Sequence, residues 1–338
     1  MGYNERKLIY KKIEEKRDRA LLVYVTSLRS GVGEHMSQDV IPQIIKHMNM
    51  IEKTEKGIDI LIISTGGDAI VPIRIVTLLR DRYKKLGAIV PYTAYSAATL
   101  LVLGADEIIM HPYSNLGPVD PQLVVNKKDQ QPMAFAYEDI KKYIEFIKDI
   151  GISDQDLMEK AFELLTKEVG TVPIGFAKRS SQLALTASEK LLSLHMEDKA
   201  KAKTISEQLN TAFYHHGYPL AREEAKQIGL NIVNSDEEME GYMWEICEDF
   251  SEEMKFNQPF NLQEIVANNI KSNFKTDDIG KVKKELVNFK TACVESIKGQ
   301  SYIEQCININ YKVDTDMNIA QNVLKYPSTW IFEKGDDE

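Results

Sequence analysis

Two turns in the first third of the chain carry residue types suited to nucleophilic chemistry. The first, residues 64–68 with the sequence STGGD, joins an apolar run to a helical pattern. A glycine pair there lets the backbone turn tightly and leaves N–H groups facing a ligand, as in an oxyanion hole. The second turn, residues 95–98 with the sequence YSAA, places Ser96 at the start of a predicted helix. The partial positive charge of a helix N-terminus favours an alkoxide or an oxyanion there.

Each turn taken alone has an ordinary structural explanation. A glycine pair after a strand is usually a simple turn, and a serine at a helix start is usually an N-cap. Their combination is more informative, because Ser96 follows Gly67 by 29 residues and the segment GADEII (104–109) comes next. The order and the spacing together favour a catalytic serine over two unrelated turns.

Four short apolar runs must position these turns. They predict buried strands at 20–27, 57–64, 87–95 and 106–112. Helical apolar spacing lies between them, at 39–56, 69–85 and 96–105. Alternation of apolar strands with helices predicts an α/β protein with a buried, largely parallel sheet and helices on its faces.

The remainder of the chain divides by its character. Residues 138–200 are predicted to be mostly helical, and 223–233 to be a helix followed by a strand. After Val233 come an acidic amphipathic helix and a hairpin that turns near residues 298–300. We therefore predict an N-terminal arm or helix at 1–19, a main domain at 20–235, and a C-terminal α+β domain of unknown role at 236–338.

Composition excludes several classes of protein. The 338 residues carry a net charge of −9, which disfavours a nucleic-acid surface, and no apolar run is long enough for a membrane span. The charged N-terminus lacks the apolar core of a signal peptide. Three cysteines without a CxxC pair fit a reducing cytoplasm, and the six histidines show no metal-ligand spacing. We assign no metal and no cofactor.

The two turns lie in a stretch that resembles the Clp-fold serine peptidases. The runs IISTGGDAIVPIRI (62–75) and VPYTAYSAATLLVLGADEIIMHPYSNLGPVDPQ (90–122) are most similar to the SDH (serine dehydrogenase proteinase) family, related to Clp protease and signal peptide peptidase A. The segment 215–233 extends the resemblance, which implies a Clp/crotonase-like fold of repeated β-β-α units and usually an oligomer. It also implies Ser96 as nucleophile and an oxyanion hole at Gly66, Gly67 and Ala97, with the N–H groups of Gly67 and Ala97 as donors.

The sequence contains several candidates for the general base. Clp protease has a histidine after its nucleophile, where this chain has Val119, so the Clp-type triad is absent. Signal peptide peptidase A uses a Ser–Lys dyad with the lysine several dozen residues downstream. That zone contains Lys141, Lys142, Lys148 and Lys160, of which Lys148 is the runner-up base. Each also fits a solvated lysine on an amphipathic helix.

His216 is the preferred base. It aligns near the region where Clp protease carries its triad aspartate, just before the helix at 223–229. An imidazole with a pKa near 6.5 can take a serine proton without strong tuning. Asp120 is a possible orienting acid, and His215 is a weaker candidate than His216.

These residues predict a cytoplasmic serine peptidase that acts on peptides or proteins and forms a homo-oligomer. One alternative is a crotonase-type acyl-CoA enzyme, which shares the fold and a similar oxyanion hole. Another is a catalytically inactive Clp-fold scaffold. A serine-reactive probe distinguishes the first prediction from the scaffold, and acyl-CoA binding distinguishes it from the crotonase type.

Overall fold

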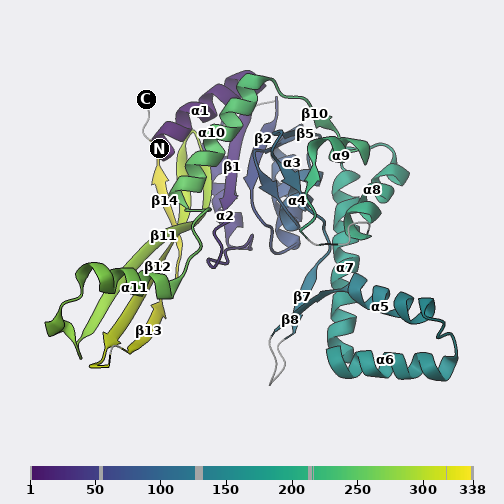
Figure 1. The fold of residues 1–338 in the computed structure, drawn as a ribbon. Helices are drawn as coiled ribbons and strands as arrows, with labels where there is room; N and C mark the ends of the chain where they lie inside the picture. Colours follow the sequence, from purple (N-terminus) through teal and green to yellow (C-terminus); the bar gives the residue numbers. More distant parts are fainter. Residues whose placement is uncertain are drawn as a thin grey trace.

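A mixed sheet forms the centre of the molecule (Figure 1). The computed structural model describes residues 2–52, 56–125, 132–211, 215, 217–316 and 318–335. The parallel part of the sheet runs in the order β10 (Ile232–Val233), β5 (Glu107–Met110), β3 (Leu86–Val90), β2 (Ile58–Ile63) and β1 (Ala20–Thr26). β1 then pairs antiparallel with β11 (Val282–Ser296), and β11 with β12 (Gly299–Val313). Both β13 (Ile319–Lys325) and β14 (Trp330–Lys334) pair with β12.

The parallel strands are buried on both faces. In β1, Leu22 and Tyr24 point into one hydrophobic core, while Leu21 and Val23 point into another, as the two-residue period of a strand requires. The first core includes side chains from α2 (Val40–Met50), α3 (Ile70–Arg82), α4 (Ala97–Leu103), α7 (Thr171–Leu192) and α8 (Lys199–Thr211). The second includes α1 (Tyr3–Arg17) and α10 (Glu237–Glu253). The predicted α/β sheet with helices on both faces is confirmed.

The segment 87–95, predicted to be one strand, is two strands. The break falls at Pro91, which lacks the N–H group that a ladder requires. After it, β4 (Thr93–Ala94) leaves the main sheet and pairs with β6 (Asn115–Leu116). β6 also pairs with β9 (Leu220–Ala221), which leads directly into α9 (Arg222–Gln227). The small second sheet carries the chain to Ser96.

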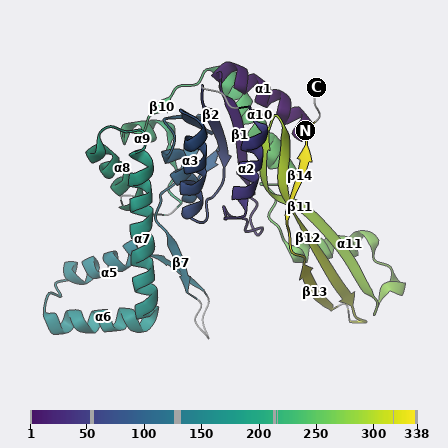
Figure 2. The ribbon, with the colours of Figure 1, turned by 180° about the vertical axis from the view of Figure 1, so that it is seen from behind.

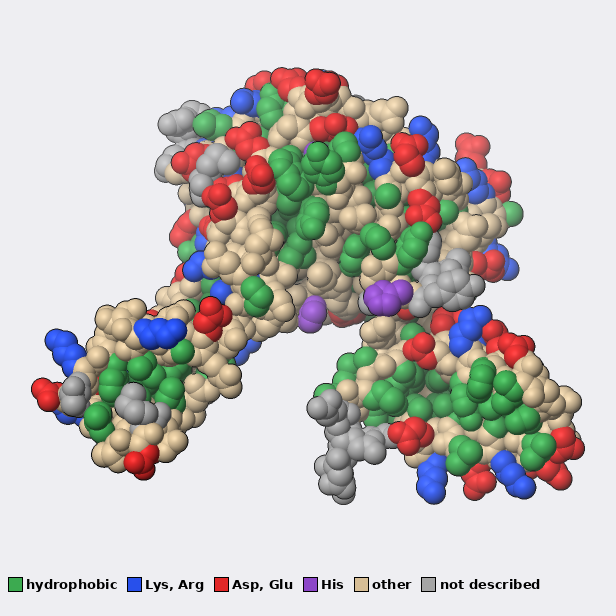
Figure 3. Space-filling model, in the orientation of Figure 1, with side chains coloured by type: hydrophobic (Ala, Val, Ile, Leu, Met, Phe, Trp, Pro, Cys, Tyr) green, Lys and Arg blue, Asp and Glu red, His purple; other side chains and the backbone are tan. Residues whose placement is uncertain are grey.

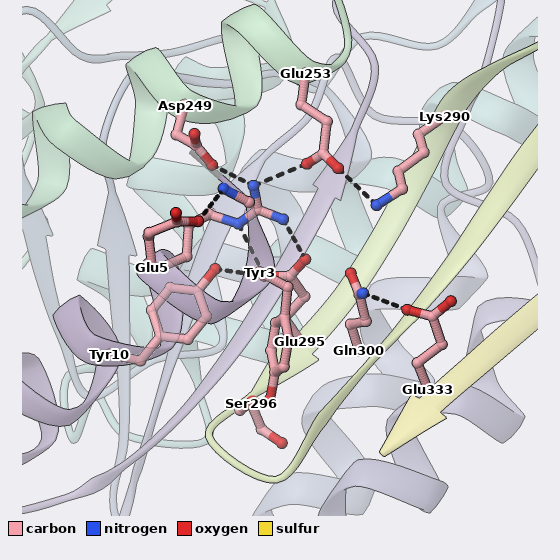
Figure 4. A network of polar contacts seen from close by, with 12 residues as sticks. Tyr3, Glu5, Tyr10, Asp249, Glu253, Lys290, Glu295, Ser296, Gln300 and Glu333 are labelled. Atoms are coloured by element: carbon pink, nitrogen blue, oxygen red, sulfur yellow. Dashed lines mark hydrogen bonds and ion pairs between the residues drawn. The ribbon is translucent and has the colours of Figure 1, made fainter. Parts of the chain in front are cut away.

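The two ends of the chain meet on one side of the sheet. Arg6 of α1 is fully buried and forms ion pairs with Asp249, Glu253 and Glu295 (Figure 4). The hydroxyl of Tyr10 donates to the Glu295 carboxylate over 2.7 Å. These contacts join α1, α10 and β11, so hydrogen bonding and ion pairing cross the predicted sequence boundary near residue 235.

Two extensions project from the central body in Figures 1 and 2. One consists of α5 (Tyr137–Asp149), α6 (Gln155–Val169), part of α7 and the hairpin of β7 (Gln122–Val125) and β8 (Met133–Ala136). The other consists of the outer halves of β11 and β12 with β13, α11 (Leu262–Asn273) and a short 3-10 helix (Thr276–Asp278). The space-filling view shows a wide concave gap between them (Figure 3). None of the helices in the described parts of the chain has both the length and the apolar character needed to cross a membrane.

Candidate active site

Ser96 has an unusual backbone conformation. It joins β4 to α4 with φ 53° and ψ −116°, although it is not a glycine. Such a conformation costs about 1–3 kcal/mol and persists only where the surrounding structure enforces it. In nucleophile elbows the serine occupies a similarly strained turn between a strand and a helix, which exposes its hydroxyl. The Ser96 side chain is half-buried and has no hydrogen-bond partner among the residues that the structure describes.

Hydrogen bonds on both sides hold the turn in place. The Tyr95 N–H donates to the Ser64 carbonyl over 3.0 Å, which ties the two predicted loops together. After the turn, the Thr99 hydroxyl lies 2.7 Å from the Ala94 carbonyl oxygen and 2.9 Å from that of Gly117. Because partners before and after Ser96 are fixed, the strained conformation is maintained by the fold.

Gly66 packs directly against the Ser96 turn. A Cβ at Gly66 would lie 2.5 Å from the Tyr95 carbonyl oxygen, 2.8 Å from the Ala97 nitrogen and 2.9 Å from Ser96 Cβ. Its φ of 99° also lies in the region that only glycine adopts easily. Any side chain at this position would displace the turn.

Gly67 approaches a different backbone segment. A Cβ there would lie 2.3 Å from the carbonyl oxygen of Met36, whose N–H donates to the Gly66 carbonyl over 2.8 Å. The Met36 carbonyl accepts from the Asp68 N–H over 2.9 Å. The N–H and the carbonyl of Met36 are therefore both hydrogen-bonded to the glycine loop, which fixes its position.

Two backbone N–H groups of the two turns have no acceptor among the described residues. Within the described residues, neither the Gly67 N–H nor the Ala97 N–H has a hydrogen-bond acceptor. Gly67 is exposed, and Ala97 is the first residue of α4, where helix N–H groups lack partners within the helix. Donors of this kind can stabilise a negatively charged oxygen.

The structure packs Gly66 against Ser96 and Ala97, but it does not bring the lysines to this turn. Lys148 is exposed on α5, in an extension that lies away from α4 (Figure 1). Lys141 pairs with Glu138 over 2.5 Å and Lys142 with Glu145 over 2.6 Å, and Lys160 is exposed on α6. Within one copy of the chain these side chains belong to the helical surface.

His216 lies outside the described residues. Its neighbour His215 is exposed, and its Nδ1 accepts from the Gly217 N–H over 3.0 Å. Asp120 is half-buried and follows Val119, whose N–H donates to the Leu209 carbonyl over 2.9 Å.

The residues that support the site were not predicted from the sequence. Met36, Thr99 and Gly117 contact the two turns, yet none lies in a pattern that predicts such a role. The one sequence signal for these supporting residues is the Asn-Leu-Gly-Pro run at 115–118. A side chain at Gly117 would collide with Tyr95, because its Cβ would lie 2.7 Å from carbons of the Tyr95 ring.

A cavity of about 490 Å³ lies beside Glu14, Arg19 and Ile297. It is at the amino ends of β1 and β2, opposite the Ser96 edge, and is not part of this site.

Sequence comparisons relate this chain to known proteins. A sequence model for ClpP-like SDH-type serine proteinases matches residues 4–172. Two uncharacterized proteins of Methanocaldococcus jannaschii are 29% identical over 175 residues and 31% identical over 189 residues, which is 52% and 55% of this chain. The matched regions are 51% and 57% of those proteins, so the chain spans about half the length of the curated relatives that it matches.

One solved structure is also similar to this chain. It is a serine-to-alanine mutant of the 1510-N membrane-bound stomatin-specific protease, 17% identical with a TM-score of 0.38. The alignment covers 65% of this chain and 83% of that one. The family match supports the Clp fold predicted from the sequence.

Proposed function

The chain belongs to the ClpP-like SDH-type serine proteinase family, and on this basis we propose that it cleaves peptide bonds through an acyl-enzyme on Ser96. The observation that carries the proposal is the strained Ser96 turn packed against Gly66. An ordinary N-cap serine needs no positive φ, because N-cap residues adopt extended backbone angles.

The proposed reaction has two halves. Ser96 Oγ attacks the peptide carbonyl carbon while a base takes the hydroxyl proton, and the N–H groups of Gly67 and Ala97 hold the resulting oxyanion. The intermediate collapses to an acyl-enzyme, and the departing amine takes the proton from the base. Water then attacks the ester by the same route and releases the acid product.

We propose His216 as the base, with Asp120 as the residue that orients it. The support comes from the residues on either side. Leu209 accepts a hydrogen bond from Val119, and Leu220 pairs with Leu116 in the small sheet. Leu116 in turn pairs with Ala94, two residues before Ser96. The residues that flank His216, Leu209 and Leu220, are thus both hydrogen-bonded to residues 116–119, which follow the pairing with β4.

We further propose a cytoplasmic homo-oligomer. The three cysteines are unpaired, which fits a reducing compartment. Large apolar side chains on the α5–α7 extension are exposed, among them Phe146, Phe162, Leu164 and Val172 at 49–80%. Figure 3 shows hydrophobic side chains spread over this extension. Contiguous exposed apolar surface is typical of a protein interface.

Hydrolysis of an activated ester and of a peptide by the Ser96→Ala protein tests the function. Loss of a nucleophile costs several powers of ten in rate, so we expect turnover to fall to background. The control is Ser272→Ala, which removes an exposed hydroxyl on α11 and should keep wild-type activity. Hydrolysis that survives in Ser96→Ala would contradict the proposal, and acyl-CoA turnover by the wild type would favour the crotonase-type alternative.

A further inference from the structure

An aromatic cluster lies on the α10 side of the sheet, where the parallel strands end. The Trp244 ring stacks on His111 with ring centroids 5.3 Å apart. Tyr113 and Tyr92 meet the same ring edge-on, at 5.3 Å and 6.2 Å. Tyr113 is 65% exposed and Tyr92 is 39% exposed, so these aromatic side chains are not part of the core. Figure 3 shows a band of hydrophobic side chains with acidic groups along one side.

A cavity of about 370 Å³ opens beside this cluster. Tyr92, Trp244 and Phe256 contribute its aromatic lining. Its size lies within the range of small-ligand sites. No part of the proposed oxyanion chemistry uses this cavity.

The charged groups in the cavity lining are both acidic. Glu248 and Glu252 are exposed, and neither carboxylate has an ion-pair or hydrogen-bond partner among the described residues. They lie one turn apart on α10, a spacing at which like charges repel. A ligand cation would relieve that repulsion, and a cation is also what aromatic rings bind favourably.

The cavity lies close to Ser96 along the chain, because Tyr92 is one of its lining residues. Tyr92 precedes Ser96 by four residues, so their Cα atoms lie within about 14 Å of each other. The intervening residues are fixed, since the Tyr92 carbonyl accepts from the Asn115 N–H over 2.7 Å and Thr93 pairs with Asn115. An extended peptide spans that distance with about four residues.

We propose that this cavity is a substrate subsite that binds a lysine or arginine side chain within about five residues of the scissile bond. The proposal rests on the peptidase function proposed for Ser96. The aromatic rings would contact the aliphatic stem and the cationic head, and Glu248 and Glu252 would neutralise the charge. A peptide without a basic residue lacks both interactions.

Binding is measured first, without hydrolysis. In a Ser96→Ala, Trp330→Phe protein the probe stays intact and Trp244 is the sole tryptophan. Its fluorescence is titrated with N-acetyl-Ala-Ala-Lys-Ala-Ala-amide and with the same peptide carrying norleucine in place of lysine. We expect the lysine peptide to bind about fivefold more tightly, and the difference to shrink at high salt.

Variants of the acidic pair complete the test. Glu248→Gln with Glu252→Gln should abolish the preference for lysine. The matched control is Glu159→Gln with Glu163→Gln, another exposed pair one helical turn apart, on α6, which should retain the preference. Equal affinity for the two peptides, or a preference that survives in the Glu248, Glu252 variant, would overturn the proposal.

Cleavage of a peptide library by the wild type separates this proposal from the proposed function. Cleavage sites should show lysine or arginine enriched at one position within about five residues of the cut. Ser96-dependent cleavage without that enrichment overturns the subsite and leaves the peptidase. Lysine binding with no cleavage of any peptide overturns the peptidase and, with it, the role as a substrate subsite.

Discussion

The conformation of Ser96 distinguishes this serine from the many others in the chain. Its φ of 53° is sterically costly, and the Tyr95 and Thr99 hydrogen bonds together with the contact from Gly66 maintain it. Only two other non-glycine residues in the described part of the chain, Asp18 and Lys255, have positive φ. Strain at a residue with a nucleophilic side chain is the strongest indication of chemistry in the molecule.

Gly66→Ala tests how closely the two turns must fit. The added methyl group would meet the Tyr95 carbonyl oxygen at 2.5 Å, so the Ser96 turn must shift. We expect more than about 1 kcal/mol of lost stability and a fall in turnover of about 100-fold. Gly175→Ala on α7 is the matched control: a Cβ there meets nothing within 4 Å, and activity should be unchanged. Wild-type turnover in Gly66→Ala would refute the required fit.

The identity of the base predicts a pH profile. If His216 accepts the proton, activity should rise through about pH 6.5 and then level off, because only the neutral imidazole can act as base. His216→Ala should lose several powers of ten in rate, and Lys148→Ala should keep wild-type turnover. The reverse result for the two variants would assign the base to the lysine.

The sequence could predict where the two turns lie, but not which residues hold them in place. Glycine pairs and a serine between strand and helix are local features, so the turns at Gly66, Gly67 and Ser96 were recognisable from their spacing. Met36 comes from another loop, and its contacts depend on tertiary packing that no local pattern encodes. The positive φ of Ser96 likewise arises from contacts on both sides of the turn.

Among the contacts between secondary-structure elements, the ion pairs of Arg6 connect α1 to α10 and β11. Replacing it with methionine would leave the Asp249 and Glu295 carboxylates buried without their cation. Removing one partner of a buried ion pair costs about 3–5 kcal/mol, and we expect a loss of that size in chemical denaturation of Arg6→Met. The control is Lys16→Met on the same helix, whose ion pairs with Asp236 and Glu238 lie at the surface. A free energy of unfolding equal to that of the wild type in Arg6→Met would show that the network is dispensable.

α2 is joined to the β11–β12 hairpin by a buried histidine. The His47 ring is fully buried, and its nitrogens lie 3.0 Å and 3.1 Å from the hydroxyls of Ser296 and Ser301. Burial, aided by the charge of Lys46, lowers the His47 pKa to about 4. The unfolded chain binds this proton below about pH 6.5, so the stabilising contribution is present above pH 6.5 and is lost as pH falls toward 4.

His47→Gln reports this contribution. The variant cannot titrate at this position, so the stability difference between wild type and variant should narrow by on the order of 3 kcal/mol between pH 7 and pH 4. Denaturation curves at several pH values measure it. A difference that stays constant across that range would contradict the buried neutral histidine.

For the whole molecule, local patterns predicted the elements better than their partners. The apolar runs at 20–27 and 57–64 predicted β1 and β2 closely, because buried parallel strands are nearly continuous in apolar residues. The pairing of β1 with β11 joins segments more than 250 residues apart and has no signal in either. The prediction of a single strand at 87–95 did not take Pro91 into account. It therefore did not include the small sheet that leads to Ser96.

The apolar α5–α7 extension predicts the state of assembly. Light scattering at micromolar concentration should give a multiple of 38.5 kDa. Leu164→Asp with Val172→Asp places charges on two of its most exposed apolar positions, and we expect a shift toward the monomer. A wild-type protein that elutes and scatters as a 38.5 kDa monomer would contradict the proposed oligomer.

The most direct test of the central claim is covalent labelling of the full chain by a fluorophosphonate, followed by intact-mass analysis and peptide mapping. We predict one adduct per chain, located on Ser96, and none on the Ser96→Ala protein. Because the proposed oxyanion donors and base would activate only this hydroxyl, the other serines should remain unmodified. An adduct on a different serine, or no adduct on folded wild-type protein, would contradict the assignment of Ser96 as nucleophile.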